Sequence, residues 1–282
     1  MFDSPIATQI IVELATGSKN SATLVAKVAK AQGCSIQSVY AVLRKLRQQS
    51  VVLLHRKVLT LNIVWIKEQS ELLRNAQATY LESSDSGTFS IGTLEEGDRL
   101  MYQFKNPVLL DDMWGHAFLL LLERTQKEMP IMIFNPHSWF SIVRYASEKT
   151  IFQSLFDRGF KAYFSFAGKG DLDRDICKKF VEPIGHSFST GVDIGLKKGK
   201  YLNVVGDYVI EVELDEALSE EIDNYFAKYQ TLEESDVKEL QAIVSKRGPN
   251  KLTLSRNTRK AHRLRSRLAK DFFIPADSRR FV

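Results

Sequence analysis

The first residues whose types and spacing could do chemistry lie in the stretch 35–49, SIQSVYAVLRKLRQQ. Ser35 is a good N-cap, and an apolar stripe with spacings of three and four predicts an amphipathic helix. The stripe consists of Ile36, Val39, Tyr40, Leu43 and Leu46. The opposite face carries no acid; it holds Gln37, Ser38, Ala41, Arg44, Lys45 and Gln48. Such side chains suit phosphates and base edges, although a basic surface helix without a partner has the same pattern.

Two helices and a hairpin are predicted around this helix. Ser4-Pro5 starts a helix that Gly17 ends, and Asn20 or Ser21 caps a second helix that ends at Gly33. After the third helix, two β-prone runs, 51–54 and 58–62, flank the basic tip His55-Arg56-Lys57. The tip lacks the Gly or Asn of a tight primed turn. We expect Arg56 and Lys57 to reach phosphates or a minor groove.

Residues 4–62 therefore resemble the winged helix-turn-helix module of prokaryotic transcription regulators. The segment SIQSVYAVLRKLRQQSVVLLHRKVLTLN carries the resemblance. This segment is similar to the pattern of MarR-, ArsR- and TrmB-type regulators. It implies double-stranded DNA as a partner. The implied DNA-binding residues are Ser35, Gln37, Ser38, Ala41, Arg44, Lys45, Gln48, Arg56 and Lys57. A winged helix used for protein contacts fits the same pattern.

The charge distribution agrees with a polyanion partner for the chain ends. Of the formal net charge of +5, residues 1–67 hold +7, residues 68–245 hold −12 and residues 246–282 hold +10. Such asymmetry indicates different tasks for the ends and the centre. With 44% hydrophobic residues the chain can build ordinary globular cores. Only Cys34 and Cys177 are present, so neither a disulfide framework nor a cysteine-based zinc site is indicated.

From about residue 90 strands and helices alternate, which predicts an α/β sheet with parallel strands at its centre. The predicted strands are 99–104, 131–134, 160–166, 186–190, 201–205 and 208–214. The predicted helices start at Asp111-Asp112 and at Ser147, and cover 172–181, 216–230 and 235–245. Before them, 63–80 is a predicted helix. Its apolar residues Ile66, Leu73, Ala76 and Tyr80 form a seam for a second copy of the chain or for its own domain.

Residues 114–229 resemble, more loosely, the phospholipase D-like domain that follows the winged helix in TrmB-type regulators. The segments that carry the resemblance are HAFLLLLERTQKEMPIMIF, SLFDRGFKAYFSF and YLNVVGDYVIEVELDEALSEEIDNYF. The resemblance implies a domain that senses a small molecule or helps to dimerise the protein. Phospholipase D enzymes need a His with a Lys two residues later, and none of the five histidines here has one. We therefore expect no enzymatic activity, no catalytic residues and no phosphodiesterase reaction.

Polar residues just after predicted strand ends are the candidates for a ligand pocket. In an open α/β sheet, ligands bind in the crevice at the carboxyl ends of the strands. The candidates are Asn135, His137, Ser165, Lys169 and Asp171, each of which could equally be a loop cap or a solvated charge. No metal-ligand spacing or cofactor motif appears, because the Gly-Lys pairs at 168–169 and 199–200 lack the Ser or Thr of a P-loop.

The C-terminal run SRNTRKAHRLRSRLAKDFF predicts a basic amphipathic helix. Leu264, Leu268 and Phe272 repeat every four residues, and the run could contact DNA phosphate, bind RNA or dock on the acidic middle. A membrane surface is a poorer match because the apolar stripe is short.

The domains predicted are 1–67, a winged helix-turn-helix; 68–89, a connecting helix and linker; 90–245, an α/β domain; and 246–282, a basic tail. The sequence indicates a cytoplasmic, homodimeric transcriptional regulator, with a small-molecule effector as a further partner and no membrane. Two alternatives remain open: a nucleic-acid-processing or defence-associated protein with a catalytic α/β domain, and an interaction scaffold.

Overall fold

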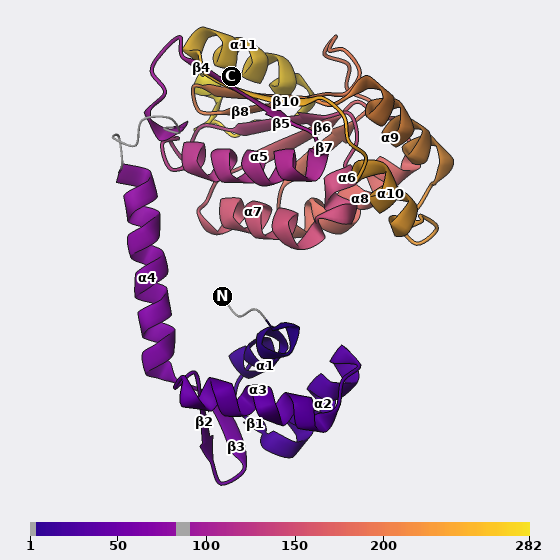
Figure 1. Cartoon of the computed structure of the whole chain (residues 1–282). Helices are drawn as coiled ribbons and strands as arrows, with labels where there is room; N and C mark the ends of the chain where they lie inside the picture. Colours follow the sequence, from indigo (N-terminus) through magenta and orange to yellow (C-terminus); the bar gives the residue numbers. More distant parts are fainter. Residues whose placement is uncertain (1–3, 83–90) are drawn as a thin grey trace. The chain divides into compact units, whose positions relative to one another are not determined.

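The computed structural model describes residues 4–82 and 91–282, which belong to two compact units that divide after Glu82 (Figure 1). The part of the predicted segment 68–89 that follows Glu82 lies outside the described residues. The chain is a mixed α/β protein with two sheets, as predicted at the level of fold class.

The N-terminal unit contains four helices and a three-stranded antiparallel sheet with the strand order β1-β3-β2. The elements are α1 (Pro5–Ala15), β1 (Lys19–Asn20), α2 (Ser21–Gln32), α3 (Ile36–Gln48), β2 (Val52–His55), β3 (Val58–Leu61) and α4 (Ile63–Glu82). Helices α2 and α3 are joined by only three residues, because Gly33 ends α2 with a left-handed φ of 58° and Ser35 caps α3. One core holds the unit together, with Ile10, Val28 and Val39 fully buried.

Helix α4 confirms the helix predicted over 63–80, and the whole of it belongs to the N-terminal unit, so the units do not divide at residue 67. The reason is local: residues 63–82 contain no Gly or Pro, so nothing in this stretch ends a helix.

The C-terminal unit is built on a seven-stranded sheet with the order β4-β10-β9-β8-β5-β6-β7. Its strands are β4 (Arg99–Phe104), β5 (Ile131–Asn135), β6 (Ala162–Phe166), β7 (Ser187–Thr190), β8 (Lys200–Val205), β9 (Tyr208–Glu213) and β10 (Asn250–Arg256). Its α-helices are α5 (Pro107–Leu122), α6 (Trp139–Val143), α7 (Tyr145–Asp157), α8 (Asp171–Phe180), α9 (Glu216–Lys228), α10 (Val237–Val244) and α11 (Thr258–Leu268). Short 3-10 turns occupy Ile91–Thr93, Glu182–Ile184, Ala269–Asp271 and Arg279–Phe281.

The sheet separates two cores, because successive side chains of a strand point to opposite faces. Ile131 and Ile133 of β5 join the larger core, which helices α5 to α10 cover. Met132 and Phe134 join the smaller core beneath α11. Figure 1 shows α11, in yellow, on the sheet face opposite to α5 and α7.

Parallel strands had been predicted at the centre of the sheet, but the structure does not place them there. Only β5, β6 and β7 run parallel, at one end, and the other pairs are antiparallel. The hairpin of β8 and β9 turns at Gly206-Asp207 and places antiparallel neighbours beside β5. The prediction was wrong because it extended the strand-helix alternation of residues 131–190 to the whole sheet.

The predicted separation of a basic tail at residue 246 is also wrong. Strand β10 lies inside the sheet, between β4 and β9, and α11 packs directly on the sheet. Residues 246–282 are therefore part of the C-terminal unit. The alternation of Leu252 and Leu254, both fully buried, is the strand signal in this segment.

Candidate nucleic-acid interface and ligand cavity

Helix α3 has one buried face and one exposed face. Val39, Leu43 and Leu46 are buried in the core of the N-terminal unit, and the Ser35 hydroxyl accepts a hydrogen bond from the Ser38 backbone N–H at 3.1 Å. All nine residues implied as DNA contacts are exposed: Ser35, Gln37, Ser38, Ala41, Arg44, Lys45, Gln48, Arg56 and Lys57. Burial of the apolar face of α3 thus leaves the predicted DNA-contacting side chains on the surface.

Two residues of the predicted apolar stripe lie on the outside of α3. Ile36 is 53% and Tyr40 is 44% exposed. The predicted stripe included too many positions. Residues 36 and 40 are one turn apart on the same side of α3, and that side faces away from the core. The exposed face of α3 therefore presents an aliphatic and an aromatic side chain beside Gln37 and Arg44.

The cations of this surface have no acidic partners. In the described residues up to 62, the only acid is Glu13, which pairs with Lys27 at 2.8 Å. Within the described part of the chain, no ion pair involves Arg44, Lys45 or Arg47 of α3. The hydroxyls of Ser35 and Ser38 lie 2.8 Å apart and bond to each other, so both are also engaged in the cap.

The turn between β2 and β3 is a tight two-residue turn. His55 pairs with Val58, and the two residues between them both have positive φ, 46° for Arg56 and 69° for Lys57. This is the pattern of a type I′ turn, which Asn-Gly normally forms, and left-handed backbone costs an L-residue roughly 1–2 kcal/mol. The Lys57 carbonyl also accepts a hydrogen bond from the Ser21 N–H at 2.8 Å, which fixes the turn to the start of α2. Two cations thus occupy positions at which smaller residues would be less strained.

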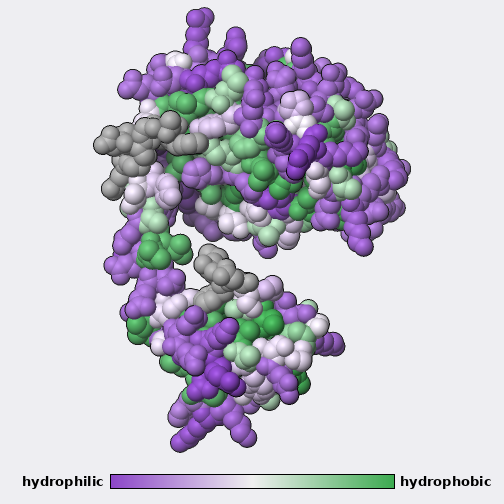
Figure 2. Space-filling model, in the orientation of Figure 1, coloured by the Kyte–Doolittle hydropathy of each residue, from purple (hydrophilic) through white to green (hydrophobic). Residues whose placement is uncertain are grey.

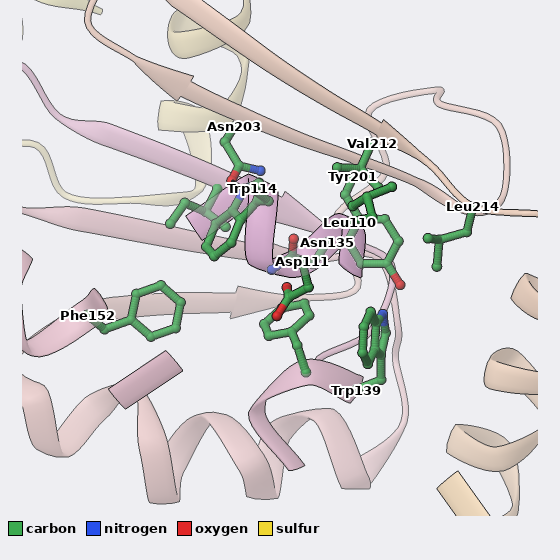
Figure 3. A pocket seen from close by; sticks show the side chains of 12 residues that line it. Leu110, Asp111, Trp114, Asn135, Trp139, Phe152, Tyr201, Asn203, Val212 and Leu214 are labelled. Atoms are coloured by element: carbon green, nitrogen blue, oxygen red, sulfur yellow. Dashed lines mark hydrogen bonds between the residues drawn. The ribbon is translucent and has the colours of Figure 1, made fainter. Parts of the chain in front are cut away.

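The C-terminal unit contains an aromatic-walled cavity of about 30 Å³, room for about two water molecules (Figure 3). Helix α5 contributes Asp111 and Trp114, and β8 contributes Tyr201 and Asn203, whose Oδ1 accepts a hydrogen bond from Trp114 Nε1 at 2.8 Å. The full lining is Leu110, Asp111, Trp114, Ile133, Asn135, Trp139, Phe140, Phe152, Tyr201, Asn203, Val212 and Leu214. Figure 3 shows the Tyr201 hydroxyl pointing toward the indole of Trp139.

The lining of the cavity contains both donor and acceptor groups. Asn135 is buried, and its Nδ2 has no acceptor among the described residues. Burial raises the pKa of Asp111 to about 7, against the opposing charge of Arg144, whose Nε lies 3.3 Å from the carboxylate. Burial also raises the pKa of the Tyr201 phenol. Asn135 therefore offers a donor to a ligand that carries acceptor oxygens or nitrogens, whereas Asp111, with a pKa of about 7, can donate or accept according to pH.

A second buried acid, Glu148 of α7, lies near Asp111. Burial and the neighbouring Asp111 raise its pKa, which Arg144 only partly offsets, and neither of its carboxylate oxygens has a partner in the described chain. Asp111 was predicted to open a helix at its positive end, but α5 begins at Pro107 with Asn106 as its N-cap. The acid therefore lies inside the helix and faces the core.

Of the five pocket candidates, only Asn135 lines the cavity. Ser165 is buried in β6, and its hydroxyl has no partner among residues 4–82 and 91–282. Lys169 and Asp171 are exposed. The loops after β5 and β6 do lie side by side, with the Ala167 N–H donating to the Asn135 carbonyl at 3.0 Å, but the side chains of Lys169 and Asp171 point to solvent and not into this cavity.

The side chain of His137 does not line the cavity and instead contacts two carboxylates and an aromatic ring. Its Nδ1 lies 2.7 Å from Asp173 and its Nε2 3.3 Å from Asp223, and its ring stacks on Phe226. Burial lowers the pKa of His137, but the hydrogen bonds and charges of the two carboxylates outweigh burial and raise the pKa to about 9. The imidazolium thus ties the loop after β5 to α8 and α9. Gly168 approaches so closely that a Cβ there would lie 2.2 Å from Asp173.

Sequence reasoning missed Asp111 and Glu148, although both carry a readable signal. Asp111 precedes Trp114, Phe118 and Leu121 at core spacing, and Glu148 likewise precedes Ile151, Phe152 and Leu155. An acid at the head of an apolar stripe points inward with it.

No family model, curated protein or solved structure matches this chain. Within the described residues, no cluster of three or more His, Cys, Asp or Glu side chains could hold a metal ion. None of the helices described here combines the length and the hydrophobicity of a membrane span.

Proposed function

We propose that the chain is a sequence-specific DNA-binding transcriptional regulator, with a winged helix-turn-helix N-terminal unit of TrmB-like type. The order α1-β1-α2-α3-β2-β3, the three-residue turn between α2 and α3 and the hairpin support this proposal. The observation that carries it is the exposed face of α3, which holds donors, amides and cations but no acid. In this proposal α3 enters the major groove and the turn at Arg56-Lys57 contacts phosphates or the minor groove.

Helix α4 is proposed as the dimer contact. Ile66, Gln69, Leu73, Ala76 and Tyr80 follow heptad spacing, and Leu73 is 60% exposed. Figure 2 shows hydrophobic side chains, in green, interrupting the hydrophilic surface along α4. Two copies joined along this helix would present two α3 helices to half-sites about one turn of DNA apart.

The C-terminal unit is proposed as a degenerate phospholipase D-like effector or dimerisation domain. The support is the cavity between α5 and the sheet, whose lining includes the unpaired Asn135 amide and the Asp111 carboxyl group. A small molecule with acceptor atoms that widened this cavity would be the effector. The domain carries no reaction in this proposal.

The proposal is tested by titrating a short labelled duplex with the full chain at salt concentrations between about 50 and 200 mM. We expect log affinity to fall linearly with log salt. The double variant Arg44→Ala/Lys45→Ala should lower that slope by about 1.8, since each lost phosphate contact contributes about 0.9. The matched control is Lys149→Ala/Lys178→Ala, which removes two exposed charges from α7 and α8. An unchanged slope in the α3 variant, with the fold intact, would remove the assignment.

A further inference from the structure

Helix α11 is fixed on the sheet by its inner face. Ala261 and Leu268 are fully buried against sheet residues that include Met132 and Val209. Arg265 is also buried: it donates hydrogen bonds to the Gly206 carbonyl and, at 3.0 Å, to the Phe281 carbonyl. Docking of the helix on its own domain, one of the predicted alternatives, is thus what the structure contains. This docking buries only one face of α11 and turns the opposite face toward solvent.

The outer side of α11 and the turn after it carry a stripe of cations. Arg259, Arg263, Arg267 and Lys270 are exposed and recur at spacings of four, four and three residues, so they share one face. Successive arginines are about 6 Å apart along the helix axis. Figure 2, viewed with Figure 1, shows hydrophilic surface over α11.

Among residues 4–82 and 91–282, the arginines of this stripe form no ion pair. Lys260, on the side of the helix, pairs with Glu211 at 2.6 Å. In the described ranges, by contrast, no ion pair involves Arg259, Arg263 or Arg267. Helix α11 itself contains no acid, and Glu96 is used at its start, where it accepts a hydrogen bond from the Thr258 N–H at 3.1 Å. Like charges four residues apart repel each other by a few tenths of a kcal/mol, so the stripe carries uncompensated positive charge.

Two further cations follow close to the helix. Arg279 and Arg280 are exposed, and the Phe281 carbonyl beside them accepts the hydrogen bond from Arg265. The Arg279 Nε donates to the Ile274 carbonyl at 3.0 Å, which holds this side chain in place. Residues 246–282 contain only two acids, Asp271 and Asp277. The basic surface therefore extends beyond α11 to Arg279, whose side chain is held on the fold, and to Arg280.

The geometry selects among polyanions. A membrane-bound amphipathic helix inserts its apolar face, but that face of α11 is buried on the sheet. Single-stranded nucleic acid is bound by aromatic side chains on which bases stack. The outer face of α11 holds no Phe, Tyr or Trp, and the exposed Phe273 beyond it has the Arg279 guanidinium over its ring at 5.6 Å. A rigid row of guanidinium groups matches regularly spaced phosphates, which arginine binds with two parallel hydrogen bonds.

We propose that the outer face of α11, through Arg259, Arg263 and Arg267, is a second binding surface for the phosphate backbone of duplex DNA. This surface acts independently of α3, and it goes beyond the recognition function proposed above. It carries no base preference, because arginine contacts to phosphate are independent of sequence.

The test compares two triple variants of the full chain on a short random-sequence duplex over about 50–200 mM salt. Arg259→Gln/Arg263→Gln/Arg267→Gln removes the stripe while keeping good helix formers. The matched control, Lys149→Gln/Lys178→Gln/Lys238→Gln, removes three exposed charges from α7, α8 and α10, on the opposite side of the sheet. We expect the α11 variant to reduce the slope of log affinity against log salt by about 2–3, and the control to change it little. The melting temperature of both should stay at the wild-type value.

The same variant in an Arg44→Ala/Lys45→Ala background separates the two proposals. If α3 does not bind DNA, that background leaves binding unchanged, yet the α11 substitutions still lower the slope. Equal slopes for the α11 variant and the control would overturn the proposal. The proposal would also be overturned if the α11 variant bound single-stranded RNA or phosphatidylserine-containing vesicles more weakly than the wild type but bound the duplex equally well. Absence of duplex binding by the wild-type chain would overturn it too.

Discussion

The strained backbone of the turn Arg56-Lys57 should lower the stability of the N-terminal unit, while the two cations of the turn should strengthen DNA binding. Both residues have positive φ, which costs an L-residue roughly 1–2 kcal/mol. Arg56→Asn/Lys57→Gly would place the preferred residues of a type I′ turn there. Glycine offsets roughly 0.5–1 kcal/mol of this gain, because it gives the unfolded chain more entropy, so a net stabilisation of about 1–3 kcal/mol remains. The loss of two cations should lower the salt slope of duplex binding by up to about 1.8.

Stability is read by hydrogen exchange of the amides of α2 and α3 in the full chain, because this reports on the N-terminal unit alone. In a unit of this size, each 1 kcal/mol corresponds to a melting shift of about 4–8 °C. The control Arg56→Gln/Lys57→Gln removes the same charges but keeps the strained backbone. It should show the same lower slope without the gain in protection.

Lower protection in Arg56→Asn/Lys57→Gly than in the wild type would refute the strain argument. A wild-type salt slope in both variants would show that the turn does not contact phosphate, whatever the stability result.

Three further outcomes are expected. Glu148→Gln should raise the melting temperature of the C-terminal unit at about pH 8 and change it little at about pH 4. The sign follows because burial raises the folded-state pKa of Glu148, so its contribution is present at low pH and lost as pH rises; an equal shift at both pH values would contradict this. The raised pKa of His137, about 9 against 6.5, predicts that about 3 kcal/mol of stability is present below pH 6.5 and lost as pH rises through 9, and that His137→Gln flattens this part of a urea-denaturation series. If the chain dimerises through α4 as proposed, Leu73→Glu should halve the mass measured by light scattering, whereas Asn75→Glu, with the same charge change, should not. Two equal masses would exclude the α4 seam.

The sequence predicted the N-terminal elements well because their boundaries have local chemical causes. Pro5, Asn20 and Ser35 mark helix starts, and Gly33 ends α2. The exposed positions of α3 followed from periodicity alone. Periodicity did not resolve the edge of the stripe, since Ile36 and Tyr40 are apolar but lie where the core does not reach.

The C-terminal unit was harder because its organisation depends on contacts between distant segments. Strand β10 pairs with β4 across about half of the chain, for example Leu252 with Tyr102, and no local signal specifies that neighbour. The charge run of α11 similarly obscured its docking, since Arg265 reads as a surface cation but is buried. The cavity combines α5, α6, β5 and β8, so Asn135 was found from its strand end while Trp139 and Tyr201 were not.

The most direct test of DNA recognition by α3 is the selection of bound fragments from genomic DNA with the wild type and with Gln37→Ala and Ser38→Ala. We predict that the wild type enriches one motif with two half-sites about 10–10.5 base pairs apart, or a multiple of this spacing. Each variant should relax the preference at a single position of each half-site by about 1–3 kcal/mol. A wild-type chain that enriches no motif, or variants that enrich the same motif with undiminished preference at every position, would contradict recognition through α3.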